Sequence, residues 1–481
     1  MDHFFHLDAT AQAALVKSGA VSPTELMEAA IARIEALNGS VNAVTLKCYE
    51  QARKQAQTAS LPQNLTEAPF AGVPFLIKDL AAMKNLPVTY GSRLFAKNTA
   101  WHNEAIVART LQAGFLIAGK TNTAEFGLLP TTEPMLFGPT RNPWNLEYSA
   151  GGSSGGAAAA VASGMVPVAQ GGDGGGSIRI PASCCGLFGL KPSRGRTVPL
   201  MRKTAGDLAV NLCLSRSVRD SARFLQAAEI SGRNAAYAPL GFVEGPSKRR
   251  LRIAYSTRNM LGSEAEPEVK AALDDVVALC ASLGHSVEEA DIPVDGEAAV
   301  KHFVACWAAG PAKLLRYFWL MRLKTWFTGT HKDVLEPWTL ELAEWYEREE
   351  QKSPGLIARA IAFFQAMQHT SDEFFSRYDV HLTPVLRRLP VRIGEFAPDT
   401  PFDDLLAACV DHITYTPLHN AMGTPAMSVP LSWSANGLPI GSQFAAQAGD
   451  ERTLLELAYE LEEARAWADK WPPISAGAKD A

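Results

Sequence analysis

Two glycine clusters carry the serines that could act as nucleophiles. Residues 151–156 read GGSSGG and contain Ser153 and Ser154, and residues 171–182 read GGDGGGSIRIPA and contain Ser177. Glycine places no side chain in the way and accepts positive φ, so backbone N–H groups in such loops can converge on one substrate atom. Hydroxyl groups beside these donors fit acyl transfer, which needs a nucleophile, a base and donors for the developing oxyanion.

The alternative for both clusters is a flexible linker, the usual role of Gly/Ser stretches. An alanine-rich segment separates the two clusters, and the second one leads directly into Ile178, Ile180 and Leu187. We therefore expect two loops held between buried elements.

The base must come from elsewhere in the chain. The sequence has no G-x-S-x-G motif, which disfavours a Ser-His-Asp hydrolase. Lys78 directly follows an apolar run at 73–77, where burial would suppress its charge. Lowering a lysine pKa from about 10.4 to between about 7 and 8 takes roughly 4 kcal/mol of desolvation. A carboxylate in contact, such as Asp79, would keep the lysine protonated, but neighbours on a strand point to opposite faces. The alternative for Lys78 is an exposed surface residue.

The elements that would position these groups alternate between strand and helix patterns. Apolar runs predict buried strands at 73–77, 115–118, 253–255 and 380–382, and helical patterns lie between them at 105–112 and 267–283. This order predicts an α/β fold with a central sheet.

A helix is also expected near the N-terminus. Ser22, Pro23 and Glu25 form its start with a capping box, and Asn38 and Gly39 its end.

Residues 300–370 have a different texture, with long helical patterns rich in tryptophan and phenylalanine. One interpretation is a helical insertion whose aromatic side chains pack on the core, and the other is a lid or a wall of the substrate pocket. The aromatic residues are Trp307, Phe318, Trp319, Trp326, Phe327, Trp338, Trp345 and Tyr346. No repeat and no linker divides the chain, so we expect one domain over residues 1–481.

Several segments together resemble the amidase signature family. AGVPFLIKD, GKTN, TRNPWN, GGSSGG, GGDGGGSIRIPA, TPLHNAMGTPAMSVPLS and GLPIGSQ occur in that family's order, and the resemblance covers nearly the whole chain. It implies that Ser177 is the nucleophile, Ser153 a proton-relaying serine after a cis peptide bond, and Lys78 the base, with Ser154 in support.

The resemblance also assigns the surroundings of Ser177. It implies an oxyanion hole from the N–H groups of Gly174, Gly175, Gly176 and Ser177, supported by a hydrogen-bond network through Asp173 and Arg179. Gly127 matches a pocket-lining position, although a simple turn glycine explains it equally well. Gly174 departs from the family, where threonine is usual, and a roomier acyl pocket could follow.

The resemblance implies an amidase signature fold, a mixed sheet covered by helices on both faces, to which the helical pattern of residues 300–370 adds an insertion. It implies a hydrolase that forms an acyl-enzyme on Ser177 and cleaves C–N bonds of apolar or aromatic amides, with carbamates (urethanes) or esters as further substrates. The stand-alone relatives resembled are nylon oligomer (6-aminohexanoate cyclic-dimer) hydrolases. No metal or organic cofactor is implied, and a homodimer is only a family-level expectation.

Composition agrees with a globular enzyme acting on a small molecule. The 481 residues are 47% hydrophobic and 20% charged, with a formal net charge of -5 and no long run of either sign, so neither nucleic acid nor membrane is expected as a partner. The N-terminus lacks the pattern of a secretory signal, which predicts a cytoplasmic location. Seven scattered cysteines without a CxxC pair predict no zinc site.

Three alternatives compete with this interpretation. Residues 114–121, GFLIAGKT, match the P-loop pattern G-x-x-x-x-G-K-[ST], but the apolar letters inside the motif predict a buried strand instead of a phosphate-binding loop. The second alternative is the A subunit of a tRNA-dependent amidotransferase, against which the aromatic-rich insertion stands. The third is a non-catalytic binding protein, which is disfavoured because Lys78, Ser153 and Ser177 are all present.

Overall fold

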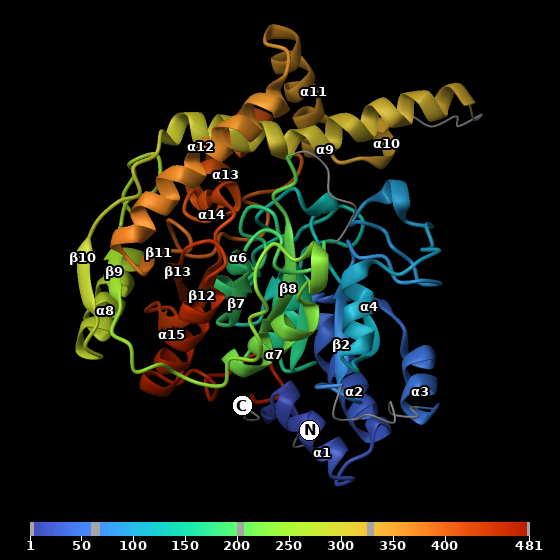
Figure 1. The fold of residues 1–481 in the computed structure, drawn as a ribbon. Coiled ribbons are helices and arrows are strands. Elements are labelled where there is room, and N and C mark those ends of the chain that lie inside the picture. Colours follow the sequence, from blue (N-terminus) through green and yellow to red (C-terminus); the bar gives the residue numbers. More distant parts are fainter. Residues whose placement is uncertain (1–3, 59–67, 200–205, 325–330, 479–481) are drawn as a thin grey trace.

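A mixed β-sheet with helices on both faces forms the body of the molecule (Figure 1). The computed structural model describes residues 4–58, 68–199, 206–324 and 331–478. Within these ranges the sheet has eleven strands, in the spatial order β1 (Val44–Lys47), β3 (Leu116–Thr121), β2 (Pro74–Lys78), β6 (Val168–Asp173), β8 (Val210–Ser215), β7 (Phe188–Lys191), β12 (Ala426–Trp433), β13 (Pro439–Ala445), β11 (Val380–Pro384), β9 (Arg252–Tyr255) and β10 (Ser286–Glu289). The described parallel pairs are β2 with β3 and β6, and β9 with β10 and β11. The predicted α/β architecture is confirmed.

The predicted strands and helices around the site are confirmed as well. The four apolar runs form β2, β3, β9 and β11, and the two helical patterns form α4 (Ala105–Gln112) and α8 (Pro267–Ser282). Every residue of β2, β3 and β11 is buried, as expected for strands covered on both faces.

The first long helix, α2 (Pro23–Val41), begins as predicted but ends later. Ser22 is its N-cap and forms the capping box with Glu25. The predicted end at Asn38 and Gly39 is wrong, because the Asn38 side chain accepts the N–H groups of Ala43 and Val44 at 2.9 and 2.7 Å and ties the following segment to the helix. The left-handed residue that ends α2 is Asn42, with φ of 53°.

Residues of β2 alternate between the two helical layers. The Phe75 ring contacts Phe224 of α7 (Val218–Ala228), with ring centroids 5.7 Å apart. Lys78, on the opposite face, reaches Ser153 and Ser154 at the start of α5 (Gly155–Ala162). The layer of α7 also includes α1 (Ala9–Lys17), α4 and α15 (Glu451–Ala464), and the layer of α5 includes α2 and α6 (Arg179–Cys185).

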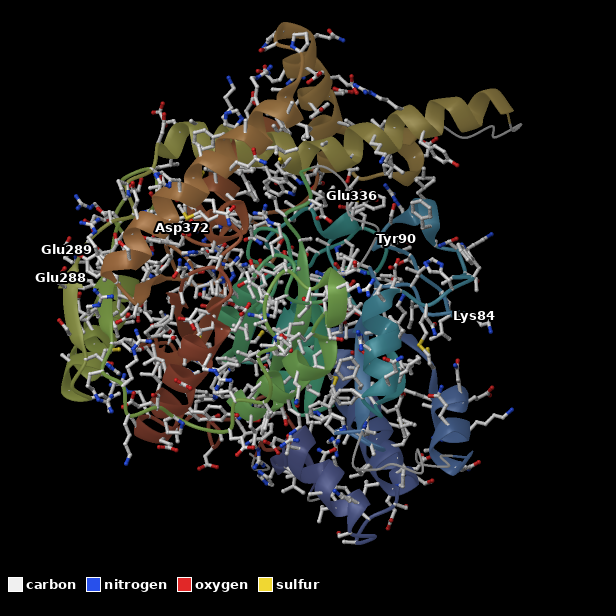
Figure 2. The ribbon with its side chains drawn as sticks, in the orientation of Figure 1. Lys84, Tyr90, Glu288, Glu289, Glu336 and Asp372 are labelled. Carbon is white, nitrogen blue, oxygen red and sulfur yellow. The ribbon has the colours of Figure 1, made fainter. Side chains whose placement is uncertain are left out.

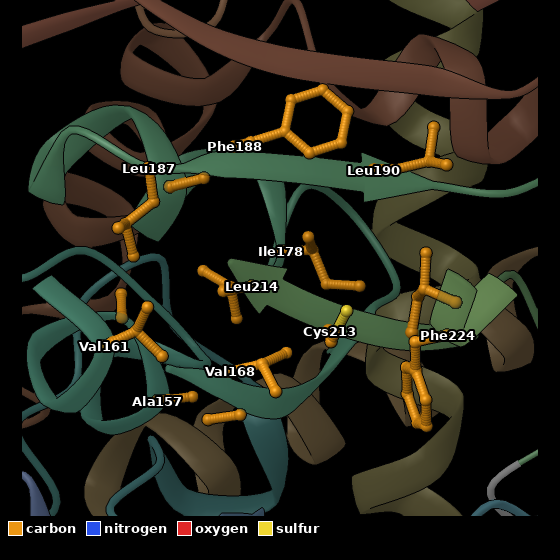
Figure 3. Close-up of a cluster of buried hydrophobic side chains, with 14 of the residues drawn as sticks. Ala157, Val161, Val168, Ile178, Leu187, Phe188, Leu190, Cys213, Leu214 and Phe224 are labelled. Atoms are coloured by element: carbon orange, nitrogen blue, oxygen red, sulfur yellow. The ribbon is translucent and has the colours of Figure 1, made fainter. Parts of the chain in front are cut away.

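The alanine-rich helix α5 is completely buried between the sheet and α6. Its residues are Gly155, Gly156 and then small apolar side chains that let the helix lie close to β6 and β8. Figure 3 shows Ala157 and Val161 of this helix in one cluster with Val168 of β6 and Leu214 of β8. This packing fixes the N-terminal end of α5, where Ser153 and Ser154 lie.

Long helices between β10 and β11 lie along one side of the sheet (Figure 1). They are α9 (Gly296–Lys324), α10 (His331–Val334), α11 (Pro337–Lys352) and α12 (Leu356–Arg377). Residues 300–370 are therefore helical over most of their length. The side chains of Phe318, Trp319, Trp326 and Phe327 lie outside the described part of the structure.

The remaining elements are short or peripheral. They are α3 (Tyr49–Thr58), α13 (Phe402–Ile413), α14 (Pro417–Met422), a ribbon of β4 (Arg141–Asn142) and β5 (Asn145–Ser149), and 3-10 turns at Phe4–His6, Arg93–Phe95, Glu125–Gly127 and Gly232–Asn234. The rings of Phe5 and Trp471 pack edge to face and bring the two chain ends together. Among the described helices, none is long and apolar enough to span a membrane.

Candidate active site

Lys78 is buried at the end of β2 and bonded to both serines of the first glycine cluster. Its Nζ atom lies 2.7 Å from Ser153 Oγ and 2.9 Å from Ser154 Oγ. Its backbone N–H donates to Gln170 Oε1 on the neighbouring β6. Burial lowers the pKa of Lys78 to about 7, although the negative charge of Asp173 acts in the opposite direction. At pH 7 about half of such amines are uncharged and able to accept a proton.

Asp79, the neighbour that could have kept Lys78 charged, is paired with another lysine. Asp79 Oδ1 lies 2.6 Å from Lys120 Nζ, and neither side chain is exposed. Asp79 also accepts the N–H and hydroxyl of Thr89. Lys120 belongs to β3, so the GKT of the P-loop pattern lies within a buried strand. The position of GKT in a buried strand, and not in a loop before a helix, disfavours the nucleotide-binding interpretation, as predicted.

The first glycine cluster is held by two threonines that precede the β4–β5 ribbon. The Gly152–Ser153 peptide bond is cis, as the resemblance implied. Thr132 Oγ1 donates to the carbonyl of Gly151 at 2.9 Å and accepts the N–H of Gly155 at 3.0 Å. A Cβ on Gly152 would lie 2.3 Å from the carbonyl oxygen of Thr131, so no larger residue fits there. Sequence reasoning missed both threonines, which lie in the segment PTTEP without a recognisable spacing.

The second glycine cluster connects β6 to α6 and places Ser177 at a pocket. Ser177 is partly exposed there, and its hydroxyl has no hydrogen-bond partner among the described residues. The N–H of Gly176 donates to Asp173 Oδ1 at 2.8 Å, so this donor is already used. The N–H groups of Gly174, Gly175 and Ser177 have no partner within the described residues. Three of the four N–H groups expected to bind an oxyanion are therefore free to do so.

Asp173 and Arg179 form a buried ion pair behind the glycine loop. Arg179 Nε and Nη2 each donate to the Asp173 carboxylate at 2.9 Å. The same carboxylate accepts the N–H groups of Gly176, Ile178 and Arg179. Burial by itself would raise the pKa of Asp173, but the charge and hydrogen bonds of Arg179 hold it well below its ordinary value. Asp173 therefore acts as a fixed anion that shapes the loop.

The C-terminal part of the chain completes this network. Arg179 Nη1 donates to the Thr416 carbonyl at 2.9 Å and to Gln443 Oε1 at 2.6 Å, and Arg179 Nη2 donates to Asn420 Oδ1 at 2.6 Å. Asn420 Nδ2 in turn donates to Asp173. These three residues were not predicted as site residues, although they lie in the segments TPLHNAMG and GLPIGSQ on which part of the resemblance rests.

One pocket of about 1200 Å³ contains Lys78, Ser153 and Ser177. Its walls are mainly apolar and come from the segment after β2, from residues 126–130, from residues 206–209 and from α9. The tyrosine, phenylalanine and tryptophan residues that line it are Tyr90, Phe95, Trp101, Phe126, Phe303, Trp307 and Tyr346. A pocket of this size and lining fits an apolar organic molecule.

Gly127 lies beside the serine of the first cluster. It has φ of +75°, and a Cβ at this position would lie 3.1 Å from both Ser153 Oγ and Leu80 Cδ1. The position thus requires glycine for its backbone conformation and for the space next to Ser153.

The start of α11 is attached to the pocket wall through Glu125, another residue that the sequence did not point out. Glu125 Oε2 accepts the N–H of Glu336 at 3.0 Å and the hydroxyl of Thr339, and Glu125 Oε1 accepts the hydroxyl of Ser92 at 2.6 Å. Trp338 Nε1 donates to the Leu128 carbonyl at 2.8 Å. Figure 2 shows Glu336 on the side of the molecule that carries Tyr90.

Known amidases and related hydrolases are similar to this chain along nearly its whole length. The family model described as Amidase matches residues 25–455. The putative amidase AmiC of Mycobacterium tuberculosis is 40% identical over 464 residues, which cover 96% of this chain and 95% of that protein. The 6-aminohexanoate-cyclic-dimer hydrolase of Paenarthrobacter ureafaciens is 36% identical over 492 residues, covering 97% and 96%.

Solved structures of amide hydrolases are also similar to this chain over nearly its whole length. A 6-aminohexanoate cyclic dimer hydrolase complexed with substrate matches with a TM-score of 0.87 and 34% identity, over 98% of this chain and 99% of that chain. A bacterial aryl acylamidase of the amidase signature family matches with a TM-score of 0.85 and 28% identity, with the same coverage.

Proposed function

The chain belongs to the amidase signature family and is an amide hydrolase, and from this premise we propose that it cleaves apolar or aromatic amides through an acyl-enzyme on Ser177. The observation that carries the proposal is the contact between Lys78 and Ser153, 2.7 Å long and completely buried, at the pocket that also contains Ser177. A neutral lysine bonded to a serine hydroxyl can draw a proton through that hydroxyl.

The proposed reaction has two steps. Ser177 Oγ attacks the carbonyl carbon, its proton passes to Ser153, and the Ser153 proton passes to Lys78. The oxyanion accepts hydrogen bonds from the free N–H groups of Gly174, Gly175 and Ser177. The relay then returns a proton to the leaving nitrogen as the C–N bond breaks. Water, activated through the same relay, cleaves the ester on Ser177 and restores the enzyme.

Supporting residues hold this arrangement without joining the chemistry. Ser154 Oγ accepts a second hydrogen bond from Lys78 Nζ. Asp173 and Arg179 keep the glycine loop in the shape that leaves three N–H groups free. Gly127 keeps space open beside Ser153.

The substrate class follows from the lining of the pocket. We propose that residues 300–370 provide its outer wall, since Phe303, Trp307 and Tyr346 line the cavity. Such a wall favours apolar and aromatic groups on the amide, and carbamates (urethanes) and esters place the same carbonyl before Ser177. The relatives described above are amidases and hydrolases by name, which favours a stand-alone hydrolase over an amidotransferase A subunit.

A panel of chromogenic anilides, carbamates, esters and primary amides tests the proposal. We expect turnover of at least one class by the wild type and a loss of at least about a thousandfold in Ser177→Ala. Ser183→Ala is the matched control, because Ser183 lies on helix α6, which directly follows the loop of Ser177, and its hydroxyl accepts the N–H of Gly441 outside the pocket. Mass spectrometry should detect one acyl adduct per chain, on Ser177. Full activity of Ser177→Ala across the panel would refute the mechanism.

A further inference from the structure

Three aromatic rings in mutual contact form one wall of the pocket. They belong to Tyr90, Phe95 and Phe126, which all line the cavity. The ring centroids of Tyr90 and Phe95 lie 5.2 Å apart, those of Phe95 and Phe126 6.0 Å, and those of Tyr90 and Phe126 6.4 Å. These separations are typical of packed aromatic pairs. We name the three residues the aromatic wall.

Two residues of the aromatic wall have an unusual backbone conformation. Among the described residues, the non-glycine residues with positive φ are Asn42, Asn85, Tyr90 and Phe126. Asparagine adopts this conformation readily, whereas a bulky side chain there is an outlier. The φ angles of Tyr90 and Phe126 are 55° and 50°. Residues held in such a conformation gather at functional sites, where the surrounding structure keeps them in place.

Backbone hydrogen bonds fix the aromatic wall to the strand that carries the base. The N–H of Phe126 donates to the carbonyl of Tyr90 at 2.8 Å. The N–H of Tyr90 donates in turn to the carbonyl of Asp79 at 3.0 Å, and Asp79 directly follows Lys78 at the end of β2. The two residues with positive φ therefore have a set position relative to Lys78.

The aromatic wall also lies next to the hydroxyl that serves the leaving group. Phe126 directly precedes Gly127, whose Cβ position is 3.1 Å from Ser153 Oγ. In the proposed reaction the leaving nitrogen receives its proton through Ser153, so the nitrogen must come within about 3 Å of Ser153 Oγ. Gly127 adds no side chain beside that oxygen. The group carried by the nitrogen therefore has the aromatic wall beside it.

A different aromatic ring lies on the oxyanion side of the pocket. The Cβ position of Gly175 is 2.6 Å from Phe303 Cζ, and the N–H of Gly175 is one of the donors proposed for the oxyanion. Phe303 comes from α9 and packs on Trp307, with ring centroids 5.8 Å apart. Phe303 is thus close to the carbonyl oxygen of a bound amide, whereas the aromatic wall is close to its nitrogen.

We propose that the aromatic wall binds an aromatic amine as the leaving group, so that amides of aryl amines (anilides) are the preferred substrates. This inference rests on the proposed function. It assigns the direction of the amide in the pocket, with the nitrogen and its ring toward Tyr90 and Phe126 and the carbonyl oxygen toward Gly175. Contacts between aromatic rings favour a planar ring at this wall over an alkyl group of similar size.

Two isomeric amides test this direction. Acetanilide and N-methylbenzamide have the same composition, but the ring is on the nitrogen in the first and on the carbonyl carbon in the second. Phe126→Leu and Tyr90→Leu each remove one ring of the aromatic wall and keep an apolar side chain. In both variants we expect kcat/KM for acetanilide to fall at least about fivefold relative to N-methylbenzamide. An isomer that binds without being cleaved is compared through its inhibition constant.

Two further variants and the wild type complete the test. Phe95→Leu removes the third ring at a position whose φ is not positive, and it should lower the same ratio without any change in a strained backbone. Phe303→Leu removes a ring on the oxyanion side and should not lower the ratio. Acetanilide turnover by the wild type that is lost in Ser177→Ala establishes the proposed function independently of the ratio, and absence of such turnover would overturn that function.

Given Ser177-dependent turnover, two results would overturn the inference about the leaving group. The first is an unchanged ratio in all three variants of the aromatic wall. The second is a fall of the ratio in Phe303→Leu as large as that in Phe126→Leu, because the ring of the amine would then not be recognised by the aromatic wall.

Discussion

The carboxylate of Asp79 is paired with Lys120, 41 positions further along the chain, and not with the adjacent Lys78. Both partners are completely buried, and Asp79 also binds Thr89 and, through its carbonyl, the N–H of Tyr90. This ion pair fastens the segment that forms one wall of the pocket. It also engages the adjacent carboxylate, which would otherwise favour the charged form of Lys78.

Replacing Lys120 by methionine should lower the free energy of unfolding by about 3 to 5 kcal/mol, since it leaves the buried Asp79 carboxylate without its partner. Urea unfolding followed by circular dichroism measures the change. The control is Lys84→Met in the segment that contains Asp79, where the lysine is exposed and projects away from the body (Figure 2). It should change the free energy of unfolding by less than about 0.5 kcal/mol. A loss below about 1 kcal/mol for Lys120→Met would contradict the role of the pair.

The pH dependence of activity should report the ionisation of Lys78. With a pKa of about 7, the amine is neutral above this pH and protonated below it, so kcat/KM should fall about tenfold per pH unit below 7. Lys78→Met should abolish activity. Lys191 is the control, because burial also lowers its pKa to about 7 while its amine bonds to the Pro192 carbonyl outside the pocket. Lys191→Met should keep the acidic limb, and loss of that limb in this variant would show that the assignment to Lys78 is wrong.

Gly127→Ala should reduce kcat about a hundredfold or more, because the new methyl group would displace Ser153 from Lys78 and would require an unfavourable positive φ. The matched control is Gly138→Ala, which carries a similar φ of +74° but has only Asn42 Nδ2, at 4.0 Å, near its Cβ position. If both variants lose activity equally, backbone strain and not crowding of Ser153 is responsible.

Acidification should destabilise the fold through buried histidines. Burial lowers the pKa of His412 to about 3, with the charges of Arg388 and Arg387 adding to the effect. Below about pH 6.5 the unfolded chain therefore takes up a proton at His412 that the folded chain does not. The free energy of unfolding then falls by about 1.4 kcal/mol for each pH unit of acidification. The free energy of unfolding of His412→Leu, measured by urea titration at pH 7 and pH 5, should decline less than that of the wild type. An equal decline in both proteins would rule out this contribution.

The sequence predicted those parts of the site that depend on local order. Lys78 follows a buried strand, Ser153 and Ser154 precede a buried helix, and Ser177 ends a glycine run, so each position could be recognised from its own segment. Residues that act through long-range contacts were missed. Asn420 reaches Arg179 across 241 positions, and Glu125 reaches Thr339 across 214, and neither pairing leaves a periodic pattern in the sequence.

Predictions from local sequence were also wrong where contacts with distant residues determine the local structure. Asn38 and Gly39 would end a helix in isolation, but the bonds from Asn38 to Ala43 and Val44 hold α2 in place until Asn42. Likewise, Gly176 could not be separated from Gly174 and Gly175 as an oxyanion donor before the position of the Asp173 carboxylate was known.

The bonds between Arg179 and the C-terminal residues have a consequence for biosynthesis. A nascent chain that has left the ribosome only as far as residue 300 already contains Lys78, Ser153 and Ser177, but it lacks Thr416, Asn420 and Gln443. Until these arrive, the Arg179 guanidinium has lost three of its acceptors, and β7 has no β12 beside it. Because such distant contacts form late in folding, the glycine loop acquires its final shape only near the end of translation.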